Sequence, residues 1–174
     1  RRLASDPMQH TLLVAEPEPE ARDYLERHLR GDGFEVTAAG WHAQALDLAE
    51  RTRPHVVLVA ETELCRRLRE GEPGRRWDRN VPVIVLTAPD ADPVDRVRAF
   101  ERGADDVVRR DLYLELVARI RALLRRSAAT VAEVLEVGDL LLDHRARQVR
   151  LRGVPVRLAG REFDLAARLV SDPH

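Results

Sequence analysis

Two residue types are scarce in this 174-residue chain, since it has no lysine and a single cysteine. All 29 basic residues are therefore arginines, a bias that we attribute to a GC-rich genome rather than to a functional need for guanidinium groups. The lone Cys65 excludes an intramolecular disulfide and favours the reducing cytoplasm as the compartment.

Long apolar runs are missing as well, because no stretch approaches the roughly 20 consecutive apolar residues that span a bilayer. Nothing at the start resembles a signal peptide, and we therefore expect no membrane partner. The formal net charge of -1 gives no general attraction to nucleic acid, so any DNA contact has to come from a local basic face. The length suits one complete domain and part of a second.

Short apolar runs alternate with helical patterns over most of the chain. The run at 81–86 is almost wholly apolar and β-branched, which is typical of a parallel strand buried on both faces. The alternation predicts an α/β fold, a (βα)5 doubly wound parallel sheet with helices on both faces. Strands are predicted at 11–14, 35–39, 55–59, 81–86 and 106–109, and helices from Pro19, over 41–51, from Pro93 to Gly103 and from Leu112.

The helix from Pro93 has clear start signals. Asp90 and Asp92 offer helix caps, and proline suits a first helical position. Three apolar residues then follow at three-residue spacing and define one face of this helix: Val94, Val97 and Phe100.

The remaining segments are less regular. Residues 1–9 lack periodicity and are interpreted as a disordered lead or an expression remnant, and the small, polar stretch 127–134 is interpreted as a linker. Beyond it, short strands are predicted around 140–142, 149–151 and 156–158, with turns at 143–145 and Gly153, and a helix through Glu162, Leu165 and Leu169.

Three stretches carry a family resemblance: VPVIVLTA at 81–88, DRVRAFERGADDVVRR at 95–110 and ELVARIRALLRR at 115–126. Together they resemble the last third of a receiver domain in response regulators of the OmpR/PhoB family. The resemblance implies a flavodoxin-like receiver over 10–126. It also implies, over 135–174, the amino-terminal sheet and first helix of a winged-helix DNA-binding effector domain.

In that family the helix that enters the major groove and the wing hairpin come later in the chain than residue 174. We therefore expect promoter DNA to be a partner of the intact protein and not of this fragment, and RNA polymerase to be a further partner. The resemblance also implies a transcription regulator located in the cytoplasm.

The functional crevice of an open parallel sheet lies at the carboxyl ends of its strands. Receivers there place a phosphoryl group on an aspartate, with Mg²⁺ on acidic side chains, a lysine and a hydroxyl. The resemblance places the acidic pair on Ala15 and Glu16, the acceptor on Ala60, the hydroxyl on Thr87 and the lysine on Arg110.

Only the hydroxyl position keeps its chemistry. The methyl group of Ala60 cannot be phosphorylated, one acidic side chain remains of two, and Asp111 stands where the family has a cis-favouring proline. The family's aromatic switch position is Val107. We therefore interpret the crevice as a degenerate phosphorylation site with no metal and no cofactor. No other part of the sequence combines a nucleophile, a general base and a residue that orients the base, so we do not expect an enzyme.

Several alternatives concern the same crevice. Glu61 would serve as acceptor or as a permanent negative charge if the strand register slipped by one residue. Glu16 would pair with Arg110 and fill the place of metal and phosphate, unless both side chains are solvated. Trp77, in an enlarged loop over 70–80, is either a ligand or partner contact or a cap on the sheet edge, which we favour.

A homodimer is also expected, through the fourth helix, last strand and last helix of the receiver. This face carries cross-subunit ion pairs in the family, and the alternative is that its charges are merely solvated. The matching positions are Arg96, Asp105, Asp106, Glu115, Arg119 and Arg126.

The leading function is thus a DNA-binding transcription regulator whose receiver acts in phosphorylation-independent dimerisation and signal input. One alternative is a small-molecule-responsive pseudo-receiver, with the ligand in the vacated crevice near Ala15, Ala60 and Trp77. The other is a protein-interaction adaptor without a DNA role.

Overall fold

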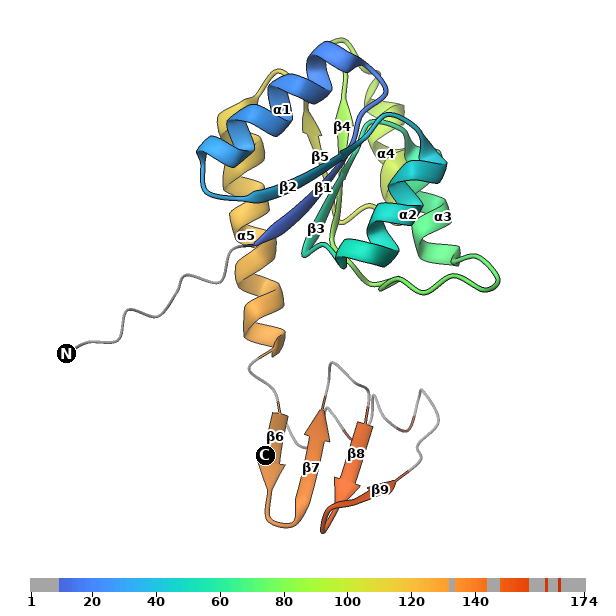
Figure 1. Ribbon diagram of the computed structural model, residues 1–174, viewed down its shortest axis with the longest axis vertical. Helices are drawn as coiled ribbons and strands as arrows, with labels where there is room; N and C mark the ends of the chain where they lie inside the picture. Colours follow the sequence, from blue (N-terminus) through green and yellow to red (C-terminus); the bar gives the residue numbers. More distant parts are fainter. Residues whose placement is uncertain (1–9, 132–133, 144–147, 157–161, 163–165, 167–174) are drawn as a thin grey trace, which may run out of the picture. The chain divides into compact units, whose positions relative to one another are not determined.

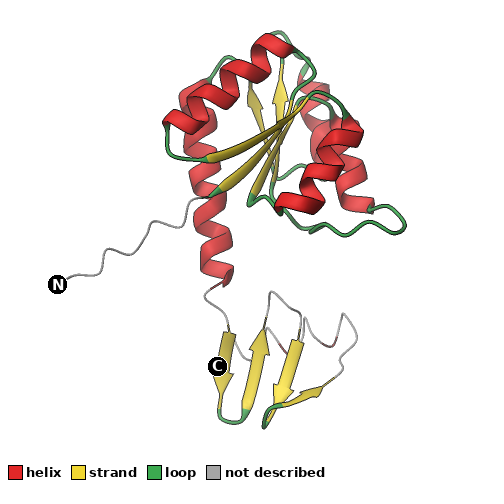
Figure 2. Cartoon of the chain, viewed as in Figure 1, coloured by secondary structure: helices red, strands yellow, loops and turns green. Residues whose placement is uncertain are grey.

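The computed structural model describes residues 10–131, 134–143, 148–156, 162 and 166 (Figure 1). The chain divides near Leu124 into two compact units. In the first unit, strands and helices alternate and end in a long helix (Figure 2). Its elements are β1 (Thr11–Ala15), α1 (Pro19–Gly31), β2 (Glu35–Ala39), α2 (His42–Thr52), β3 (Val56–Val59), α3 (Thr62–Glu70), β4 (Val83–Thr87), α4 (Pro93–Glu101), β5 (Asp106–Arg109) and α5 (Tyr113–Val131), whose residues after Leu123 belong to the second unit.

The five strands form one parallel sheet in the order β2-β1-β3-β4-β5. Helices α1 and α5 cover one face, and α2, α3 and α4 cover the other (Figure 1). All four residues of β3 are buried, as expected for a strand covered on both faces. The predicted doubly wound α/β fold is confirmed.

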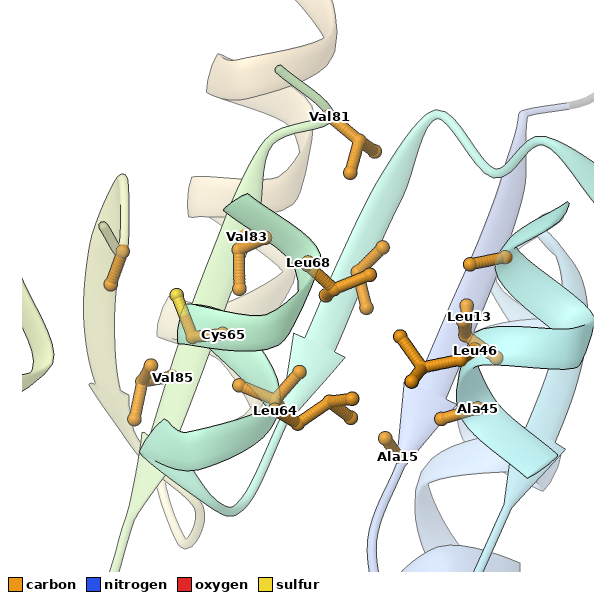
Figure 3. Packing of buried hydrophobic residues seen from close by; sticks show 14 of the residues in the cluster. Leu13, Ala15, Ala45, Leu46, Leu64, Cys65, Leu68, Val81, Val83 and Val85 are labelled. Carbon is orange, nitrogen blue, oxygen red and sulfur yellow. The ribbon is translucent and has the colours of Figure 1, made fainter. Parts of the chain in front are cut away.

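Side chains that alternate along the central strands build the core under α2 and α3 (Figure 3). Leu13, Val57 and Val83 are fully buried there against Leu46 and Leu64. Cys65 belongs to the same cluster, and its thiol donates to the Arg102 carbonyl at 3.3 Å. Burial raises the pKa of this thiol to about 11, so it stays protonated and unreactive near neutral pH.

Helix α4 begins as predicted, because the Asp92 carboxylate accepts from the Val94 backbone N–H at 2.8 Å. The three apolar residues that the sequence places on one face of α4, however, are not buried in the core. Ala99 is the buried residue of α4, whereas the exposed fractions are 51% for Val94, 56% for Val97 and 48% for Phe100. Regular spacing of apolar residues thus predicts which residues share a face of the helix, but it does not predict whether the core covers that face.

The loop at 71–82 is held against its neighbours. The Trp77 indole N–H donates to the Leu68 carbonyl at 2.9 Å, and the half-buried ring packs on the core. Arg75 contacts the carboxylates of Asp47 and Glu50 in α2. Trp77 therefore closes the carboxyl end of α3, a structural role of the kind that the sequence favoured.

The second unit contains an antiparallel sheet in the order β6-β7-β8-β9. Leu142 and Val149 are buried at its centre. Its strands are β6 (Val134–Val137), β7 (Leu140–Asp143), β8 (Gln148–Leu151) and β9 (Val154–Val156). Strand β6 was not predicted, and β9 begins two residues before the predicted strand at 156–158, whose last two residues lie outside the described part.

The predicted linker at 127–134 needs correction. Helix α5 continues through Val131, and β6 begins at Val134, so most of the predicted linker is regular structure. Alanine is the strongest helix former, and Ala128 and Ala129 prolong the helical pattern. The predicted lead at 1–9 lies outside the described residues, as does the predicted helix through Leu165 and Leu169 except at Glu162 and Ala166.

No helix in the described part of the chain is long and apolar enough to cross a membrane.

Candidate functional site: the crevice at the strand ends

The carboxyl ends of four parallel strands place the predicted site residues at one edge of the sheet. The Ala60 backbone N–H donates to the Ala15 carbonyl at 3.0 Å, and the Arg110 N–H donates to the Thr87 carbonyl at 2.9 Å. These bonds extend the β1–β3 and β4–β5 ladders by one residue. Ala60 and Thr87 are half-buried, and the edge they occupy is the one that the sequence indicated.

Glu16 is the one buried charged residue of the described core, with an exposed fraction of 1%. Its Oε1 accepts from the Glu18 backbone N–H at 3.1 Å, which turns the chain from β1 into α1. Its Oε2 lies 3.7 Å from the guanidinium of Arg110, a contact too long for a hydrogen bond but within ion-pair range. The ion pair that the sequence suggested across the crevice is therefore present.

The other predicted positions offer less chemistry. Ala15 is the last residue of β1, is 7% exposed and packs in the apolar core. Asp111 is bound by Arg109 at 2.7 Å, and this hydrogen bond lowers the pKa of the carboxyl. Among the described residues, no group of three or more histidine, cysteine or acidic side chains could hold a metal ion.

The register of β3 also decides the alternative for Glu61. Val59 pairs with Ala15 on one side and with Val85 on the other, so Ala60 is the residue that follows the strand into the crevice. The carboxylate of Glu61 instead lies 2.5 Å from the His42 Nε2 at the start of α2. A slipped register with Glu61 as acceptor is therefore wrong.

Arg110→Met should lower the free energy of unfolding by about 2 kcal/mol, because it leaves the buried Glu16 carboxylate without its cation. We expect a smaller loss than the roughly 3–5 kcal/mol caused by removing one partner of a fully buried ion pair, because the Arg110 side chain is 34% exposed. Adding Glu16→Gln should recover part of the loss, because the amide oxygen can still accept from Glu18. Urea unfolding of the two single variants and the double variant measures the coupling. Additive losses would show that the two side chains do not interact.

A cavity of about 350 Å³ lies beside this crevice, over the ends of β1, β2 and β3. Of the three residues near which the sequence suggested a ligand, Ala15 lines this cavity, and Ala60 and Trp77 do not. Trp41 was not among the predicted site residues, although its place just after β2 is a sequence signal for this edge of the sheet. The lining residues are Ala15, Glu16, Pro17, Gly40, Trp41, His42, Ala43, Glu61 and Leu64.

The charges predicted for a dimer face are partly engaged within the chain. Arg119 contacts Asp106 at 3.0 Å and Glu115 at 2.6 Å. Asp105 contacts Arg69 at 2.7 Å, while Arg96 and Arg126 have exposed side chains. The same surface includes the exposed apolar residues of α4.

Comparison with known proteins agrees with the fold. The chain is 37% identical over 176 residues to the DNA-binding response regulator MtrA of Mycolicibacterium smegmatis, covering 97% of this chain and 74% of that protein. It is 42% identical over 163 residues to the transcriptional regulatory protein PrrA of Mycobacterium leprae, covering 91% and 70%. No family model matches the chain.

A solved structure has the same architecture: the response regulator DrrB, a Thermotoga maritima OmpR/PhoB homolog, with a TM-score of 0.53 and 24% identity over 94% of this chain and 73% of DrrB. The fold is thus that of a receiver followed by part of an effector domain. With the identity to MtrA, it shows that the chain belongs to the OmpR/PhoB-type response regulators, the transcription regulators of two-component systems.

Proposed function

We propose that this protein is a DNA-binding transcription regulator whose receiver works without phosphorylation. The observation that carries the proposal is the crevice itself, where the methyl group of Ala60 follows β3 and the Glu16–Arg110 ion pair spans the strand ends. The pair supplies a fixed negative and positive charge where the family uses metal, phosphate and lysine. The charge arrangement in the crevice is then constant, because no phosphoryl transfer changes it.

Incubation with acetyl phosphate and Mg²⁺ should leave the intact mass of the protein unchanged, because no carboxylate stands at the acceptor position. Intact-mass spectrometry provides the measurement, and a receiver with an intact acceptor aspartate, treated in parallel, controls for the reagent. A stoichiometric gain of one phosphoryl group would sink the proposal.

The proposal includes the absence of a Mg²⁺ site. Mg²⁺ requires near-octahedral oxygen ligation, usually with one or two carboxylates. Glu16 supplies one carboxylate, which already accepts from Glu18 and faces the Arg110 cation. A second cation next to that guanidinium would be repelled.

We further propose that the receiver forms a two-fold dimer through α4, β5 and α5. The exposed apolar residues Val94, Val97 and Phe100 supply area that a partner copy can bury, and Arg96 of the predicted face belongs to the same helix. The in-chain pairs of Arg119 can exchange partners across such an interface. This assigns a purpose to the apolar face of α4 that the core does not use.

The relatives MtrA and PrrA are named as a DNA-binding response regulator and a transcriptional regulatory protein. By analogy we propose promoter DNA as the partner of the intact protein, RNA polymerase as a further contact, and the cytoplasm as the location. Dimerisation would bring two effector domains to adjacent half-sites, which is how a symmetric regulator reads a repeated DNA sequence.

A further inference from the structure

The cavity over the ends of β1, β2 and β3 has the size of a small-molecule site. Its volume of about 350 Å³ falls at the lower end of the roughly 300–1,000 Å³ that ligand pockets occupy. Its walls are mainly apolar, with Ala15, Pro17 and Leu64 among them. Such a cavity suits a compact molecule with an apolar body.

Contacts between its three surrounding loops hold the cavity open. Arg22 donates to the carbonyl oxygens of Glu16 and Pro17 at 2.9 and 3.3 Å, which fixes the loop after β1. The Gly40 N–H donates to the Gln44 side chain at 3.0 Å, and a Cβ at Gly40 would lie 2.8 Å from the Arg22 guanidinium. The cavity is thus built into the fold rather than left between mobile loops.

The third loop is joined through a carboxylate–imidazole contact. His42 Nε2 lies 2.5 Å from Glu61 Oε2, but the contact is not aligned as a hydrogen bond, and the ring nitrogen has no other partner. Glu16 Oε2 is likewise buried without a hydrogen-bond partner. Both of these atoms are closed off from solvent, so the Glu61 carboxylate, with a side chain that is 52% exposed, is the acidic group of the lining that a bound molecule can reach.

The charge of the lining selects the ligand. Glu61 is the accessible carboxylate of the lining, because Glu16 is buried and paired with Arg110, and no arginine belongs to the lining. The nearby cations are engaged elsewhere, Arg22 on carbonyl oxygens and Arg110 on Glu16. Trp41 adds an indole that is 66% exposed at the rim, a surface on which an ammonium group binds by cation–π attraction.

We propose that this cavity binds a small organic cation, an amine with a short apolar body. Its apolar part lies against Ala15, Ala43 and Leu64, and its ammonium group lies between Trp41 and Glu61. The cavity shares Ala15 and Glu16 with the phosphorylation crevice, but Ala60, Thr87 and Arg110 do not line it. It would give the receiver of the proposed regulator a chemical input, although binding itself does not depend on that function.

Titration calorimetry with 2-phenylethylamine tests the site. We expect saturable one-to-one binding with a dissociation constant on the order of 0.1–1 mM, which a ligand of this size reaches at ordinary efficiency. The neutral analogue 2-phenylethanol should bind at least about fivefold more weakly, and 3-phenylpropanoate should not bind, because both lack the attraction to Glu61. No saturable binding of the amine, or equal binding of the alcohol, would overturn the proposal.

Variants locate the site. Trp41→Ala and Glu61→Gln should each weaken amine binding by about three- to fivefold. Ala43→Phe should abolish it, because Ala43 is exposed and a ring at this position fills the cavity without entering the core. Glu35→Gln removes a carboxylate at the opposite end of β2 and should leave binding unchanged.

Circular dichroism checks that each variant is folded. Unchanged binding in Ala43→Phe would refute the assigned cavity. A protein that binds no amine yet dimerises and resists acetyl phosphate would refute this inference alone, so its failure is distinguishable from failure of the proposed function.

Discussion

Val97→Asp should convert the proposed dimer into a monomer at micromolar protein concentrations. Val97 is 56% exposed at the middle of the apolar face of α4, between Val94 and Phe100. In a two-fold interface each substitution acts twice. Loss of two buried methyl-rich side chains and the introduction of two desolvated carboxylates should together cost about 3 kcal/mol, roughly a 150-fold rise in the dimer dissociation constant.

Sedimentation equilibrium over a range of concentrations measures this change. Ala43→Asp is the matched control, since it adds the same charge at an exposed alanine of α2, outside the proposed face. It should leave the dimer intact. A wild-type protein that stays monomeric at high concentration, or a Val97→Asp variant that dimerises as well as the control, would refute the interface.

A charge reversal at Arg119 is a poorer test of the same interface. Arg119 contacts Asp106 and Glu115 within its own chain, so Arg119→Glu would place three carboxylates together in each monomer. Any loss of dimer would then be mixed with a loss of local structure. Val97 avoids this difficulty because its side chain is apolar and 56% exposed, so replacing it breaks no ion pair within the monomer.

The sequence predicted the receiver sheet well, because its signals are local. Strands β2 and β5 begin and end at the predicted residues, since glycines or polar residues bound their apolar runs. Prediction was weaker where one residue type suits two structures. The small residues of 127–131 suit a linker and a helix equally, and only the continuing pattern of α5 distinguishes them.

The candidate site was predictable where it depends on position along a strand. The end of β3 places Ala60, and the ends of β1 and β5 place Glu16 and Arg110, so their proximity follows from the parallel sheet. The cavity was predictable in this way only in part: Gly40 and Trp41 follow directly after β2, but the contact of His42 with Glu61 joins segments that are distant in the sequence. The contacts of Arg69 were not predictable for the same reason, because its partners are distant in the sequence.

The contacts of Arg69 hold the segments around β4 and β5 in place. From α3, its Nε donates to the Gly103 carbonyl at 2.9 Å and one terminal nitrogen donates to the carbonyls of Arg79 and Val81, each at 2.7 Å. The other terminal nitrogen contacts Asp105, whose carboxylate also accepts from the Val83 N–H at 2.8 Å. Asp105 is therefore engaged inside the chain, which weakens its predicted role at a dimer interface.

Arg69→Met should therefore lower the free energy of unfolding by about 3 kcal/mol. Methionine keeps the aliphatic packing but leaves three carbonyls and one carboxylate without their donor, and water reaches some of them because Arg69 is 22% exposed. Arg66→Met, one turn earlier in α3, is the control and should cost under about 1 kcal/mol, since Arg66 makes exposed pairs with Glu63 and Glu70. Urea unfolding at neutral pH compares the two. Equal losses would mean that the Arg69 contacts add nothing beyond an ordinary surface pair. A larger loss for Arg69 would show that the contacts of this one α3 side chain with the segments around β4 and β5 stabilise the receiver more than an ordinary surface pair does.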